Sequence, residues 1–83
     1  MIYLILTKEG FEEAKQRILQ DRAMLWVNHD ILSKEQQALL AENKISVTLL
    51  SSPVNPANEK EIIAAIESIE KDYPDANIFV EYV

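Results

Sequence analysis

Two five-residue runs near the amino end of the chain, Ile2–Leu6 and Ala23–Val27, contain no polar position. Successive side chains of a β-strand point to opposite faces of its sheet, so a run of this kind must be covered on both faces. A buried helix would give the same pattern, but five residues are too few for one, and polar residues follow each run. The pattern predicts two central strands of a parallel sheet sandwiched between helices.

Two later segments are mostly apolar but also carry polar residues, which indicate that one face of each segment is exposed to solvent. Ile45–Leu50 alternates, with Ser46 and Thr48 on one face. The opposite face of that segment carries its apolar residues, Ile45, Val47 and Leu49. Ile78–Val83 contains Glu81. Both segments are therefore predicted to be strands at the edges of the sheet.

Helix signals separate these four strands. Thr7 is suited to cap a helix that runs to about Gln20, and Ser33 with Gln36 matches a capping box. We expect the second helix to end near Glu42, with Asn43 as a left-handed cap.

A third helix is predicted after Asn58, which forms a cap signature with Glu61, and it should end before Pro74. Its apolar positions have the strongest helical periodicity in the chain, and they are Ile62, Ile63, Ile66, Ile69 and Tyr73.

The elements alternate as βαβαβαβ, which predicts a three-layer α/β domain with a mainly parallel four-stranded sheet. Strand order 3-2-1-4 places the all-apolar strands in the centre, and it explains the long connector of residues 51–58 as the path from one edge to the other. The alternative order, 2-1-3-4, would place Ser46 and Thr48 inside the sheet. Under the first order two helices share one face and the third helix lies alone on the other, so part of that second face should stay bare. Exposed apolar sheet is usually an interface, so we expect a homodimer or a protein partner.

Composition narrows the function classes. The 83 residues predict one domain, 1–83, and the net charge of −6 comes with dispersed lysines and arginines. Nucleic-acid binding and binding to an anionic membrane are disfavoured, because both normally require a basic patch. With no cysteine there is no disulfide framework or thiol site, and a cytoplasmic location is the default expectation.

Candidate chemistry lies at the carboxyl ends of the predicted strands, where open α/β sheets bind ligands. The residues there that could bind a small ligand or an anion are Thr7, Asn28, His29, Asp30, Ser51 and Ser52. His29 could be a general base, but it is the only histidine, and the spacing identifies no nucleophile and no metal-ligand set. Gly10, the only glycine, is far short of a glycine-rich phosphate loop.

The sequence therefore assigns no catalytic residue, no metal and no cofactor. It favours a non-enzymatic interaction module that acts through self-association or a protein partner. The alternatives are a small-ligand or anion-binding protein or enzyme with the site just described, and a subunit of a larger assembly that docks its acidic surface on a basic partner.

Overall fold

The computed structural model describes residues 1–81, and it has four strands and three helices in that part of the chain. In chain order they are β1 (Ile2–Ile5), α1 (Lys8–Asp21), β2 (Met24–Val27), α2 (Lys34–Glu42), β3 (Val47–Leu49), α3 (Glu59–Asp72) and β4 (Ile78–Glu81). All strand pairs are parallel, and the sheet order is β3-β2-β1-β4. The predicted α/β fold and the preferred strand order 3-2-1-4 are confirmed.

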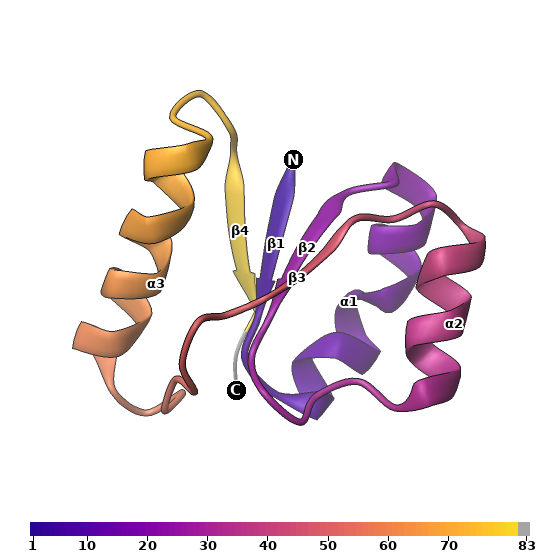
Figure 1. The fold of residues 1–83 in the computed structure, drawn as a ribbon, viewed down its shortest axis with the longest axis horizontal. Helices are drawn as coiled ribbons and strands as arrows, with labels where there is room; N and C mark the ends of the chain where they lie inside the picture. Colours follow the sequence, from indigo (N-terminus) through magenta and orange to yellow (C-terminus); the bar gives the residue numbers. More distant parts are fainter. Residues whose placement is uncertain (82–83) are drawn as a thin grey trace.

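The helices form two unequal layers around the sheet. In Figure 1, α1 and α2 lie on one side of the strands and α3 lies alone on the other, as predicted. Tyr3 and Ile5 of β1 pack into the cluster beneath α1 and α2, whereas Ile2 and Leu4 pack into the cluster beneath α3. All four residues are buried, so the first run of apolar residues is covered from both sides.

The predicted helix starts are confirmed by side-chain caps. The Thr7 hydroxyl accepts a hydrogen bond from the Gly10 N–H at 2.9 Å, and Ser33 and Gln36 form a reciprocal capping box. The end of α2 differs from the expectation for Asn43, whose φ is −90°, while Lys44 is the left-handed residue with φ 58°. The Asn43 side chain instead donates to the Leu39 carbonyl at 2.8 Å, so it caps the helix from a right-handed backbone.

The buried stripe of α3 is narrower than its sequence suggested. Ile62, Ala65 and Ile69 are buried against the sheet, but Ile63 is 52% exposed and Tyr73 is also exposed. Ile63 is one residue, or about 100°, around the helix from Ile62, and a flat sheet covers only one side of a helix.

The largest difference from expectation is the location of the apolar sheet surface that no helix covers. Val47 and Leu49 are paired in register with Leu25 and Val27, which places them on the face of α1 and α2, yet they are 40% and 56% exposed. The nine-residue α2 buries only Leu40 along its length, so it leaves β3 uncovered. On the face of α3, Trp26, Leu50 and Val54 are buried in the cluster beneath the helix, although a cavity of about 260 Å³ remains between α3 and the loop after β3.

The long connector follows the predicted path from one edge of the sheet to the other. It leaves β3, passes the carboxyl ends of the strands and enters α3, which leads to β4 at the opposite edge (Figure 1). The predicted fourth strand extends to Val83, but residues 82 and 83 lie outside the described part of the chain.

Candidate functional site

Two regions at the β2–β3 side of the sheet could have a function. The first comprises the polar residues after β2, which the sequence suggested, and the second is the outer edge of β3. The hydrogen bonds of the polar residues determine what chemistry they can still perform.

Asn28 is the only buried polar residue among the described residues, and it joins three segments. Its Nδ2 donates to the carbonyl oxygens of Leu6 and Val54 at 3.2 and 2.6 Å. Its Oδ1 accepts from the backbone N–H groups of His29 and Val54 at 3.0 and 2.8 Å. The side chain thus ties the end of β1 and the loop after β3 to the end of β2, and its bonding capacity is fully engaged.

His29 fixes the same loop from another position. Its Nε2 lies 2.7 Å from the Leu50 carbonyl oxygen, and because a carbonyl only accepts, this nitrogen must be the donor. The backbone N–H of Leu50 also donates to the Val27 carbonyl at 3.0 Å. Nε2 therefore helps to hold the loop after β3 in place.

The other candidate residues do not converge with this pair. Thr7 caps α1, and Asp30 is exposed with φ 61°, on the side of the sheet covered by α1 and α2. Ser51 and Ser52 line a separate cavity on the side of α3. The six residues therefore do not surround one pocket, and Asp30 is separated from the two serines by the sheet.

The second region is a groove between β3 and α2, with a volume of about 430 Å³. Its walls are mostly apolar, and they include Ile31, Leu32, Ala41, Ile45, Val47 and Leu49. Asn28, Asp30 and Gln37 supply its polar groups. Concave apolar surface of this kind is typical of binding sites.

The outer edge of β3 also offers backbone hydrogen-bonding groups. Ser46 O accepts from Leu25 N, and Leu50 N donates to Val27 O, so the backbone groups of these residues point toward β2. Alternate residues of a strand direct their backbone groups to opposite sides, and those of Val47 and Leu49 therefore point away from the sheet. No other strand of residues 1–81 pairs with this edge.

Val47 and Leu49 were not among the site residues predicted from the sequence. A usable signal was present, because residues 46–50, which contain the edge strand β3, have no charged residue and no proline. Edge strands are commonly protected by such residues against pairing with another chain.

Neither region has the composition of a metal site. No group of three or more histidine, aspartate or glutamate side chains in the described range is placed to hold a metal ion. None of the helices in residues 1–81 is long and apolar enough to cross a membrane.

Comparisons with known proteins gave no further guidance: no family model matches the sequence, and neither a curated protein nor a solved structure is significantly similar to it.

Proposed function

We propose that this protein is a non-enzymatic interaction module that self-associates through the outer edge of β3. The observation that carries the proposal is the combination, at one edge, of outward-pointing backbone groups with two exposed apolar side chains, Val47 and Leu49. Such an edge is suited to receive another strand.

A second copy of the chain suits this edge because the edge is complementary to itself. If two β3 strands pair in an antiparallel arrangement about a two-fold axis near Thr48, Val47 of each copy lies opposite Leu49 of the other. Their backbone groups then bond reciprocally. The four apolar side chains lie on one side of the joined sheet, beside the two grooves, and shield one another from water.

Charge at the two ends of the edge favours the antiparallel direction. Lys44 is exposed just before β3, and Asp30 is exposed at the groove near the carboxyl end of the strands. Reversing one strand against the other brings Lys44 of each copy toward the partner end that carries Asp30. A parallel pairing would instead place like ends together.

The expected dimer is weak. Val47 and Leu49 are already partly covered, so each contributes about 1 kcal/mol on further burial, well below the value for a fully exposed side chain. Association has an unfavourable entropy of about 4–15 kcal/mol, and the net charge of −6 on each copy adds repulsion. A reversible dimer with a micromolar Kd, stronger at moderate salt than at very low salt, is the expected outcome.

Sedimentation equilibrium across micromolar concentrations tests this proposal. The wild-type chain should be in monomer–dimer equilibrium, and Leu49→Lys should remain monomeric. Ile63→Lys is the matched control, since Ile63 is similarly exposed but lies on α3, away from β3. A monomeric wild type, or equal loss of dimer in both variants, would refute self-association at this edge.

The predicted cytoplasmic location is part of this proposal and stays a prediction. Fractionation of cells that express the chain would test it.

A further inference from the structure

The opposite edge of the sheet, formed by β4, also has backbone groups that point outward. Among the strands of residues 1–81, β4 has β1 as its only neighbour. The Asn77 carbonyl accepts from the Ile2 N–H at 2.9 Å, and Ile2 is in register with Ile78. Residues 77 and 79 therefore direct their backbone groups toward β1, and the N–H and C=O groups of Ile78 and Val80 point away from the sheet.

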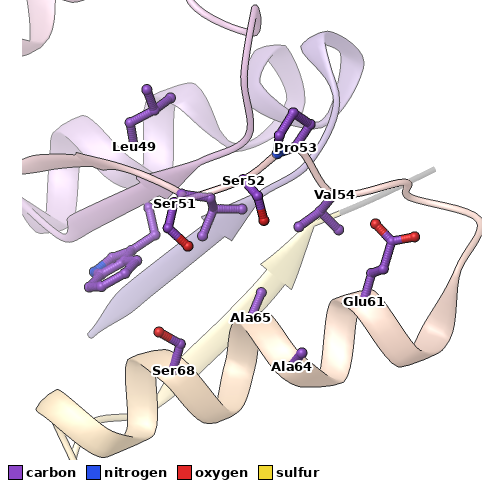
Figure 2. A pocket seen from close by; sticks show the side chains of 11 residues that line it. Leu49, Ser51, Ser52, Pro53, Val54, Glu61, Ala64, Ala65 and Ser68 are labelled. Carbon is purple, nitrogen blue, oxygen red and sulfur yellow. The ribbon is translucent and has the colours of Figure 1, made fainter.

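An apolar groove lies beside this edge, between α3 and β4, which are neighbours in Figure 1. It has a volume of about 300 Å³, and its apolar walls are Ile62, Ile63, Ile66 and Val80. Ile63 is 52% exposed although it faces this apolar surface. In Figure 2 the other flank of α3, with Ser68, faces the loop after β3, so the groove is separate from the cavity there.

The charged residues on the groove side of α3 are acidic. Glu59 lines the groove, and none of the described lysines or arginines does so. Glu70 lies seven residues after Ile63, which places it on the same flank of the helix. Both carboxylates are exposed, so they can pair with a cation on a partner.

The face of β4 that lies toward α1 has the opposite character. The Phe79 ring packs on Tyr3, with their centroids 5.2 Å apart, and Cζ of Arg17 lies 5.2 Å from the Phe79 centroid. A basic side chain placed on this face would be repelled by Arg17. A strand added to β4 would therefore have to direct its basic residues toward α3.

From this edge we infer a binding site for an extended, basic segment of another protein, which adds to the sheet as a further strand beside β4. This site is independent of the self-association proposed above. Alternate residues of the bound segment point toward α3. Two apolar residues among them pack on Ile63 and Val80, and a lysine or arginine on either side pairs with Glu59 or Glu70.

The spacing of the two carboxylates fits this arrangement. Glu59 and Glu70 are eleven residues apart, or about 16 Å along the helix axis. Two lysines six residues apart in a strand are separated by about 20 Å and point to the same face, with two residues between them that also point there. The long lysine side chains can accommodate the small difference.

A second copy of this chain does not suit the edge. Antiparallel pairing of two β4 strands about a two-fold axis would place the two α3 helices side by side on one face, running in opposite directions. Glu59 of each copy would then approach Glu70 of the other, and each copy has a net charge of −6. The same charges that oppose a second copy attract a basic segment.

The acetylated and amidated peptide Lys-Thr-Val-Thr-Val-Thr-Lys is a suitable probe. Its titration into the ¹⁵N-labelled chain should shift the amide resonances of Ile63, Ile78 and Val80 in a saturable manner with one common Kd. Amide exchange of Ile78 and Val80 should become slower as their N–H groups enter the new strand pair. The same peptide with both lysines replaced by glutamate should bind at least about ten-fold more weakly. A linear response, or equal affinity for the two peptides, would overturn the inference.

Variants at the two edges of the sheet locate the site. Ile63→Lys should weaken peptide binding by about ten-fold or more, because a charge replaces an apolar wall of the groove. Leu49→Lys carries the same change of charge at β3 and should bind the peptide as the wild type does, even though the proposed self-association is lost. Weaker binding in Leu49→Lys but not in Ile63→Lys would overturn the assignment to β4, and sedimentation tests the proposal for β3 separately.

A second pair of variants tests the role of charge. Glu59→Gln should weaken binding by about two- to five-fold, as expected for an exposed ion pair, and the effect should diminish at high salt. Glu42→Gln is the matched control, because Glu42 is exposed on α2, on the other side of the sheet. Equal weakening in the two variants would show only general attraction to an acidic protein and would overturn the pairing with α3.

Discussion

The carboxyl end of β2 and the outer edge of β3 lie side by side in the sheet but differ in what they can still bind. After β2, the amide of Asn28 makes four hydrogen bonds to Leu6, His29 and Val54. At β3, the backbone groups of Val47 and Leu49 point outward, and their side chains remain exposed. The side chain of Asn28 is thus fully hydrogen-bonded, whereas the edge of β3 keeps backbone groups that can still bind.

This contrast shows that residue type alone does not identify a binding site. Asn28 and His29 resemble site residues because they follow a buried strand, yet they are needed to hold the loop that starts after β3. Val47 and Leu49 have no reactive group, but they combine outward-pointing backbone N–H and C=O groups with exposed apolar side chains. If the contrast is correct, substitutions after β2 should change stability, whereas substitutions at the edge should change association.

The largest expected effect is on the folding free energy of Asn28→Ala. The substitution leaves the N–H and C=O groups of Val54 without their partner and opens a small void, so we expect a loss of about 3 kcal/mol. Urea unfolding of the monomer measures this loss, against a total stability of roughly 4–12 kcal/mol for a domain of this size. Asn43→Ala is the control, because Asn43 is exposed with one side-chain bond to Leu39. Equal losses in the two variants would contradict a special role for Asn28.

The next effect concerns association. Leu49→Lys should raise the dimer Kd by at least about ten-fold, or ~1.4 kcal/mol, because a charge replaces an apolar contact beside the two-fold axis. Its monomer stability should change by less than about 0.5 kcal/mol, since Leu49 is mostly exposed. Sedimentation and urea unfolding measure the two quantities on the same sample. A variant that loses stability without losing association would reverse the assignment of the two regions.

A smaller effect is expected at Thr7, which lies at the same end of the sheet as Asn28. Thr7→Ala removes the acceptor for the Gly10 N–H and should lower the free energy of unfolding by about 1 kcal/mol. Thr7→Ser retains the hydroxyl and should recover most of that loss. If alanine and serine were equally unfavourable, the cap would not explain the presence of Thr7.

The smallest expected effect is the loss of stability in the variant His29→Ala. It removes one partly buried hydrogen bond to the Leu50 carbonyl and should lower the free energy of unfolding by roughly 0.5–1 kcal/mol. His29→Gln places an amide donor at the same site and should lose less. Amide exchange of residues 50–54, measured by NMR, should accelerate in the alanine variant. Unchanged exchange in this loop would show that His29 does not hold it.

The strand order could be predicted because it depends on local composition. Ile2–Leu6 has no polar residue, so it was expected at the centre of the sheet. Ser46 and Thr48 indicated that their strand lies at an edge of the sheet. The capping box at Ser33 was equally readable, since both of its partners lie within four residues.

The candidate site could not be predicted in the same way, because its features depend on distant residues. The bonds of Asn28 to Val54 span 26 residues, and no short pattern encodes them. The exposure of Val47 and Leu49 depends on how far α2 extends over β3. The alternation of apolar and polar residues along the strand does not predict this. The sequence suggested uncovered sheet on the face of α3, whereas the exposed apolar side chains of the sheet, Val47 and Leu49, lie on the face of α1 and α2.

Amide hydrogen exchange at Val47 and Leu49 tests the central claim most directly, because their N–H groups point out of the sheet in the isolated chain. At concentrations that favour the dimer, these two amides should exchange slowly, and on dilution they should exchange rapidly while the amides of β1 remain protected. If both amides exchange rapidly at every concentration, even when sedimentation detects a dimer, the copies do not join through β3.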